Sequence, residues 1–288
     1  MYQVSSENTF ASTRSSAGSF RWSGAVTFVL VVCLYAAVAR DLVHDWWSDE
    51  GASYGFVIPP IAIGLAWVRR QALRATPAYP DRRGFLILTL ACLMLVAGRI
   101  GADFFIMRLS FIALLAGLIA TIWGFGRLRV LAFPLAVLAT MIPVPGLLYT
   151  RFAIPLQLLA SETATSIVRH LGGTIYREGN ILQLPGLTLG VAEACSGLRS
   201  ISALSIVALL MGFSHCRTAV GRLLVFAFAI PLAITVNVLR VSGTVLLASL
   251  SENLAMGFYH SFSGWAVFLG SSVVMFYLAR GLHKLWDL

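Results

Sequence analysis

Charged residues are scarce in this chain. They make up 11% of its 288 residues, whereas a typical soluble domain has about 25%. Hydrophobic residues make up 58% of the chain, and the mean hydropathy is +0.84. This composition excludes a soluble globular protein and indicates an integral membrane protein.

Long polar segments are also lacking, so we expect one polytopic membrane domain over residues 1–288 and no separate soluble module. Apolar windows of about 17 to 25 residues, the length that crosses a bilayer, predict an all-α protein with about eight transmembrane helices. The expected spans are residues 24–40, 51–68, 84–98, 109–123, 130–148, 197–213, 220–239 and 263–280. The first apolar run follows Arg14 and Arg21 and also fits a cleavable signal peptide.

Acidic residues are few, with 12 Asp and Glu against 21 Lys and Arg, which gives a net charge of +9. If the N-terminus is cytoplasmic, most of the basic residues fall on the cytoplasmic side and most of the acidic residues on the other side. This distribution satisfies the positive-inside rule. The positive charge is therefore a signal of orientation, and no nucleic-acid partner is expected.

The expected domain divides into four segments. They are a polar cytoplasmic tail (1–23), five N-terminal spans (24–148), an extracytoplasmic segment (149–194) and a region of three spans (195–284). In the third segment, RFAIPLQLLASETATSIVRH is amphipathic and suits a helix that lies in the membrane interface.

The rest of the extracytoplasmic segment has the pattern of strands. Turn signals at Glu178-Gly179-Asn180 and Pro185-Gly186 separate short β-branched and leucine runs, and they predict one or two hairpins. Such a segment could act as a lid, as an edge that pairs with an extended peptide, or as a structural plug over the helices.

Cysteine is rare, with four in the chain. Cys33, Cys92 and Cys216 fit the common role of a small core residue. Cys195 differs, because it lies beside Glu193 in the stretch GVAEACSGLRS at the predicted outer end of the sixth span. It has no cysteine or histidine at metal-ligand spacing and no evident outer cysteine to pair with, so neither a metal nor another cofactor is expected.

The residues next to Cys195 favour a reactive thiol. Ser196 and Gly197 resemble the start of a helix, which would place the sulfur at the positive end of the helix dipole. Arg199 follows one turn later on the same face. Both features lower the pKa of a thiol and therefore favour the nucleophilic thiolate.

Two more polar positions fall at the same predicted membrane face. Arg240 lies at the outer end of the seventh span with Asn237 on the same helix face, and His260 directly precedes the eighth span. The three spans are consecutive and joined by short connections, so we expect them to pack as neighbours. Taken alone, Arg240 also fits an interfacial residue that reaches lipid headgroups, and His260 also fits a satisfied interfacial histidine.

Four blocks of the sequence resemble the exosortase/archaeosortase family. EGNILQLPGLTLGVAEACSGLRS, IPLAITVNVLRV and GFYHSFSGWAVFL occur in the family's order and with similar spacing. YGFVIPPIAIGLAWVRR resembles the family's amino-terminal signature, although Tyr54 stands where the family commonly has a histidine. The histidine at position 260 resembles the bacterial exosortase branch of the family, because archaeal relatives often carry arginine at this position.

The resemblance implies a membrane-embedded cysteine protease and transpeptidase at the outer face of the bacterial inner membrane. Such an enzyme cleaves the C-terminal sorting signal of exported proteins, which consists of a recognition motif such as Pro-Glu-Pro, a transmembrane helix and a basic tail. The implied intermediate is a thioester acyl-enzyme, and the implied partners are these exported substrates and membrane lipid. The implied catalytic residues are Cys195, Arg240 and His260, with Glu193, Ser196, Gly197, Arg199 and Asn237 as supporting or substrate-binding positions.

Two other functions remain compatible with the residues. One is a non-catalytic membrane scaffold, which would tolerate replacement of Cys195. The other is a transporter component of exopolysaccharide export, which would need a polar path through the bilayer. The unusual polar positions of this chain cluster at one predicted face instead.

Overall fold

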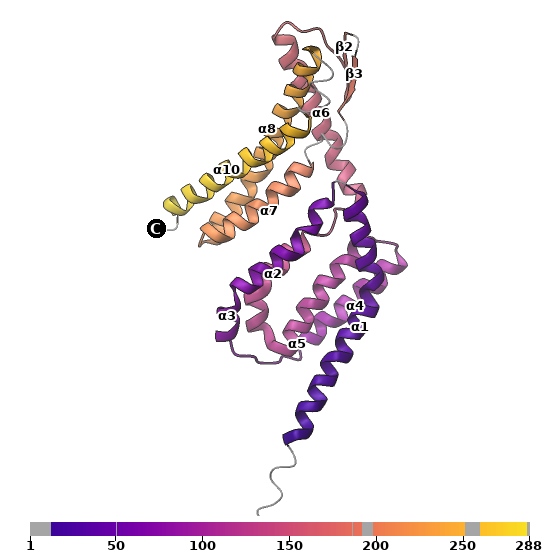
Figure 1. Cartoon of the computed structure of the whole chain (residues 1–288), viewed down its shortest axis with the longest axis vertical. Coiled ribbons are helices and arrows are strands. Elements are labelled where there is room, and N and C mark those ends of the chain that lie inside the picture. The colour runs from indigo at the N-terminus through magenta and orange to yellow at the C-terminus, as the bar shows by residue number, and fades with distance from the viewer. Residues whose placement is uncertain (1–12, 50, 186, 192–197, 251–259, 287–288) are drawn as a thin grey trace, which may run out of the picture.

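The computed structural model describes residues 13–49, 51–185, 187–191, 198–250 and 260–286, which are helical apart from one small sheet and the connections (Figure 1). The elements in chain order are α1 (Thr13–Ser48), the 3₁₀-helix η1 (Ser53–Phe56), α2 (Ile58–Val68), α3 (Arg70–Ala75), α4 (Gly84–Ile100), α5 (Phe104–Ala139), α6 (Gly146–His170), β1 (Tyr176–Glu178), β2 (Ile181–Leu184), β3 (Leu187–Gly190), α7 (Leu198–His215), α8 (Ala219–Leu250) and α10 (His260–Trp286). The helix α1 begins inside the segment expected to be a polar tail and is longer than the span expected there.

Three of the described helices, α5, α8 and α10, are long and apolar enough to cross a membrane. Three shorter apolar stretches overlap further predicted spans, namely Ser53–Val68, Gly84–Ile100 and Arg199–His215. The chain is therefore a mainly helical membrane protein, as predicted from its composition. The number of eight crossings stays a prediction.

The helix α5 consists of two antiparallel arms joined at Gly124. The backbone of Gly124 is not helical (φ 86°, ψ 168°), and a Cβ there would collide with the carbonyl of Tyr79, so only glycine fits. Arg108 and Leu138 line the same cavity, although an unbroken helix would hold them about 45 Å apart. The chain therefore reverses at Gly124, and the arms 104–123 and 125–139 correspond to the fourth and fifth predicted spans.

The N-terminal half of the fold is built around this helical hairpin. The helix α4 packs antiparallel to the first arm of α5, with Gly84 against Thr121 and Gly98 against Met107. The missing glycine side chains let the two backbones approach closely. The helix α1 covers both of them through a buried cluster that contains Tyr35, Val38, Ala91, Leu95 and Leu114.

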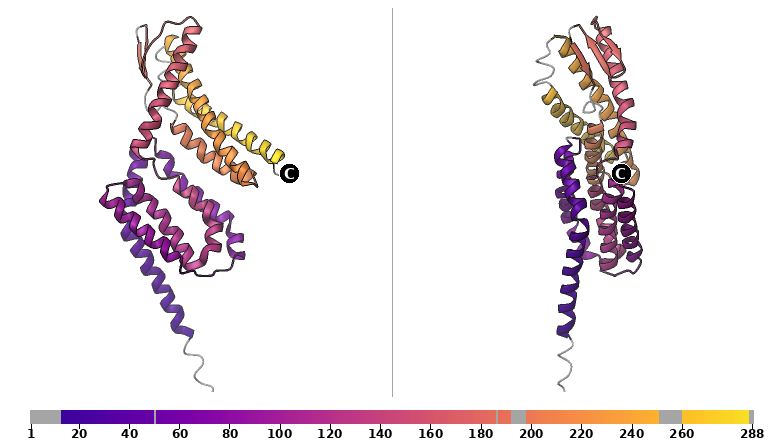
Figure 2. Two further views of the ribbon diagram at one scale, coloured as in Figure 1. Left: turned by 180° about the vertical axis from the view of Figure 1, so that it is seen from behind. Right: turned by 90° about the vertical axis from the view of Figure 1, so that its right-hand side faces the viewer.

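The C-terminal half is a bundle of α7, α8 and α10, which pack on one another along most of their lengths (Figures 1 and 2). Its core pairs large and small side chains, which are Leu204 and Ala208 from α7, Val225 and Ala229 from α8, and Met275 and Ala279 from α10. Such pairs allow helices to approach closely in a membrane, where packing replaces the hydrophobic effect as the main driving force.

The segment between the fifth and sixth predicted spans forms a helix followed by a sheet, as the sequence predicts. The strands pair in the order β1-β2-β3 and are antiparallel, so they form two consecutive hairpins. The first hairpin turns at Gly179 and Asn180, where Gly179 has φ 62°, a value that glycine adopts readily. The second lies between Leu184 and Leu187, and Gly186 of the predicted turn is outside the described residues.

The helix α6 packs along α8 and carries the sheet at one end of the molecule (Figure 2). The residues that α6 presents to α8 and to the sheet are small, and they share a core with both. This core contains Ala160, Ala164, Val168, Leu182, Leu184, Val241 and Val245. The predicted position of α6 in the membrane interface stays a prediction.

The helix α7 also contacts the N-terminal half. Its Ile206 belongs to a buried cluster with Trp46 and Val137, and its Phe213 stacks on Phe133 of α5 with ring centroids 3.6 Å apart. One face of α7 therefore packs on the N-terminal half, while α8 and α10 pack on the rest of it.

Candidate active site

The structure describes four of the eight residues predicted for the site. Arg199 lies in the first turn of α7, Asn237 and Arg240 lie on α8, and His260 is the first residue of α10. The other four, Glu193, Cys195, Ser196 and Gly197, lie outside the described residues.

The start of α7 lies opposite the polar part of α8. The two helices are antiparallel, and Gly212 of α7 packs against Arg222 of α8, where a Cβ on the glycine would be 3.3 Å from the arginine Cα. Leu198, the first residue of α7, lies 14 residues before Gly212, and Val236 lies 14 residues after Arg222. In antiparallel helices these two residues are therefore at the same level. Asn237 therefore lies at the level at which the chain enters α7.

The start of α10 lies at the same part of α8. Arg240 directs its guanidinium toward α10, so that a Cβ on Gly264 would be 3.8 Å from Nη1 of Arg240. Gly264 is one turn after His260 on the same helix face, because residues four apart in a helix are neighbours. Arg240 therefore lies within about one turn of the position of His260 along α10.

Buried polar residues accompany this arrangement. Asn237 is only 3% exposed and Ser263 of α10 only 5%, while Arg240 is half-buried. Polar side chains inside spanning helices are costly and are typical of functional sites. The starts of α7 and α10 and the middle of α8 thus form one polar region of an otherwise apolar bundle.

The approach to residues 192–197 is fixed by the sheet. Val191 is the last described residue before this segment, and its N–H donates to the carbonyl of Asn180 at 2.8 Å. In return, Nδ2 of Asn180 donates to the carbonyl of Val191 at 3.2 Å. Ser161 of α6 donates to the carbonyl of Gly179 at 3.1 Å, so the same turn is bound to α6. The hairpin segment therefore anchors the chain four residues before Cys195.

Tyr54 contacts the first turns of α7, and the sequence did not predict this contact. Its phenol lies beside Ser202 of α7, and Ser202 is one turn after Arg199 on the same face. The amino-terminal block that contains Tyr54 thus reaches the first two turns of α7. The sequence could mark Tyr54 only as a departure from a motif, because nothing local identifies a partner that lies so far along the chain.

No cluster of three or more His, Cys, Asp or Glu side chains suited to a metal occurs within the described ranges. The polar region of the bundle offers instead a permanently charged donor, an amide and hydroxyls. Such groups can bind a carbonyl oxygen or a developing oxyanion, and a nucleophile at the start of α7 would lie beside them.

Comparison with known proteins identifies a family. Residues 46–277 match the family model described as transmembrane exosortase. The match includes η1, the sheet, α7, α8 and the start of α10, and therefore all the residues predicted for the site. Searches of curated proteins and of solved structures gave no match.

Proposed function

The chain belongs to the transmembrane exosortase family, and from this premise we propose that it is a membrane-embedded cysteine transpeptidase. One observation carries the proposal. The start of α7, Arg240 and the start of α10 converge at one level of the three-helix bundle. A nucleophile at Cys195, a cation at Arg240 and a proton carrier at His260 would then act on one peptide bond.

The proposed reaction begins with attack of the Cys195 thiolate on a peptide carbonyl. The C–N bond breaks, a thioester joins Cys195 to the upstream part of the substrate, and the downstream part leaves as an amine that takes a proton from His260. Arg240 stabilises the oxyanion of the tetrahedral intermediate, because its guanidinium is always charged and directs several donors. An amine or a water molecule then attacks the thioester and regenerates the thiolate.

The proposed substrates are exported proteins with a C-terminal sorting signal that consists of a recognition motif of the Pro-Glu-Pro type, a transmembrane helix and a basic tail. A substrate held by its own helix presents its motif at a fixed depth in the membrane. The basic residues of the chain support a site at the outer face of the bacterial inner membrane. The sheet beside α6 is suited to guide an extended motif toward residue 195.

The test is cleavage of a tailed substrate produced together with the full chain in bacterial membranes. Cys195→Ala should abolish loss of the tail, measured by mass, and should abolish a thiol-linked adduct on denaturing gels. Cys92→Ala is the matched control, because Cys92 is an exposed cysteine on α4 in the N-terminal half, and this variant should cleave like the parent. If Cys195→Ala cleaves like the parent at equal abundance, the chain is a scaffold and the proposal is wrong.

A further inference from the structure

A cavity lies in the N-terminal half, away from the proposed active site. It has a volume of about 470 Å³ and lies between α1, α2 and the two arms of α5. Its walls are almost wholly apolar, and they include Leu42, Ala62, Leu115 and Leu135. Of the residues proposed for the active site, the four that the structure describes do not line it. Water does not fill such a space stably, because it needs polar partners.

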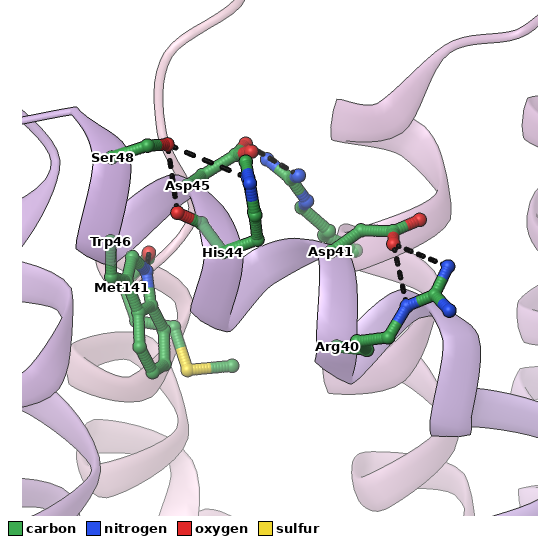
Figure 3. A network of polar contacts seen from close by, with 8 residues as sticks. Arg40, Asp41, His44, Asp45, Trp46, Ser48 and Met141 are labelled. Carbon is green, nitrogen blue, oxygen red and sulfur yellow. Dashed lines mark hydrogen bonds and ion pairs between the residues drawn. The ribbon is translucent and has the colours of Figure 1, made fainter.

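One end of the cavity is closed by polar contacts (Figure 3). Nε1 of Trp46 donates to the carbonyl of Met141 at 3.0 Å, and Arg108, which is 6% exposed, pairs with Asp45 at 2.6 Å. These contacts join the ends of α1 and of both arms of α5. We call this the closed end.

The opposite end is basic. The walls there include Ala66 of α2 and Leu131 of α5. Within about one turn of them the chain carries four arginines, which are Arg69, Arg70, Arg127 and Arg129. One acidic residue, Asp81, lies nearby, since its N–H contacts the carbonyl of Ala120. We call this the basic end, and its charge is strongly positive.

The cavity also reaches the outer surface of the helices. Val43 of α1 and Ile63 of α2 line it, yet they are 45% and 70% exposed. A slender apolar molecule in the bilayer can therefore enter between α1 and α2.

The length of the cavity matches one acyl chain. From Tyr35 to Trp46, α1 runs along it for about 16 Å, and one acyl chain spans about half of the hydrocarbon core of a bilayer, which is about 15 Å. We propose that the cavity holds one acyl chain of an anionic phospholipid, whose phosphate lies at the arginines of the basic end. The acyl chain fills space between helices that would otherwise lack contacts, and the arginines select the headgroup by charge.

The first test is native mass spectrometry of the full chain purified from bacterial membranes in a mild detergent. The parent should retain about one phospholipid per chain, enriched in anionic headgroups relative to the membrane extract. Ala62→Phe, which fills the cavity, should reduce this adduct at least fivefold. Gly64→Phe is the matched control, because it adds the same ring to α2 where nothing lies within 4 Å, and it should retain the adduct.

A double variant and a control variant test whether the arginines of the basic end select the lipid headgroup. Arg70→Gln combined with Arg129→Gln should remove the preference for anionic lipid, since both side chains are exposed at the basic end. The control is Arg99→Gln, which changes an exposed arginine at the end of α4. Its neighbour Gly98 packs on Met107, so residue 99 lies near the closed end. Retention of the anionic preference by the double variant would overturn the headgroup assignment.

A third measurement needs no variant. An anionic phospholipid with a photoreactive group on its acyl chain, added to the parent in vesicles, should crosslink to the peptides that contain Leu42, Ala62 and Leu115. Crosslinks confined to outward faces of the helices would overturn the proposal. The proposal is also wrong if the parent retains only detergent, or if a folded Ala62→Phe retains lipid like the parent. These readouts are independent of substrate cleavage, so they do not depend on the proposed function.

Discussion

At the scale of single residues, Arg240 is the described residue that most directly connects the structure with the proposed chemistry. Its guanidinium approaches α10 at Gly264, where the absence of a side chain leaves room beside the helix start. A guanidinium presents several donors in a fixed plane, whereas an ammonium is a point charge on a flexible stem. For the proposed role as an oxyanion donor, we therefore expect directed hydrogen bonds to matter at residue 240 in addition to charge.

We predict that Arg240→Lys lowers the rate of tail cleavage about 100-fold, the size of effect found when one oxyanion donor is removed. The variant should accumulate normally, because it keeps the charge. The measurement is the initial rate of substrate cleavage at matched abundance, with Arg280→Lys, an exposed arginine of α10, as the control. A rate equal to that of the parent would show that charge alone suffices at residue 240.

The residues of the site differ in how far the sequence could identify them. Arg240 and Asn237 are visible because polar side chains are rare in an apolar span. The approach of Arg240 to Gly264 follows from consecutive spans that pack as neighbours. The approach of Tyr54 to Ser202 could not be predicted, because it depends on how the two halves of the fold dock.

At the scale of elements, the sheet fixes where the chain approaches the nucleophile. Asn180 binds both backbone groups of Val191, and its Nδ2 also lies 3.5 Å from Oε1 of Gln157 on α6. A single side chain thus links the first hairpin, the end of β3 and α6. Loss of this amide should loosen the segment that leads to Cys195 while leaving the helices in place.

We predict that Asn180→Ala speeds amide exchange at Val191 and along β3 about fivefold to tenfold, since a hydrogen bond of this kind contributes roughly 1 kcal/mol. Cleavage should fall severalfold, because the nucleophile is less well positioned. Thr188→Ala changes an exposed residue of β3 and should alter neither property. Unchanged exchange at Val191 in Asn180→Ala would show that other contacts hold the strand.

Elements that depend on local sequence could be predicted, whereas packing between distant segments could not. Glycine and asparagine at positions 179 and 180 specify a tight turn by themselves, so the first hairpin could be predicted from the sequence. The break near residue 124 was visible as the end of an apolar window, and the structure shows that the chain reverses there. The packing of α6 along α8 was not visible, because alanines at 160 and 164 fit equally well against lipid or protein.

At the scale of the whole molecule, the two halves have separate tasks in our interpretation. The C-terminal bundle carries the groups proposed for catalysis. The N-terminal half supports α7 through Val137, Phe133 and Tyr54, and it encloses the cavity proposed for lipid. Because α7 belongs to both packing interfaces, a change in the N-terminal half can reach the proposed nucleophile through it. The orientation of both halves in the membrane then decides which compartment the active site faces.

We predict that the start of α4 and the sheet lie on opposite sides of the membrane. They are at different ends of the molecule (Figure 1), and the basic residues place the first on the cytoplasmic side. In a background whose four cysteines are replaced by alanine, Glu178→Cys should react with a membrane-impermeant thiol reagent in spheroplasts. Arg83→Cys should react only after the membrane is opened. Both residues are exposed in the fold, so access to the reagent depends on the membrane. Reaction at residue 83 but not at residue 178 would invert the topology and place the proposed active site in the cytoplasm, where exported substrates could not reach it.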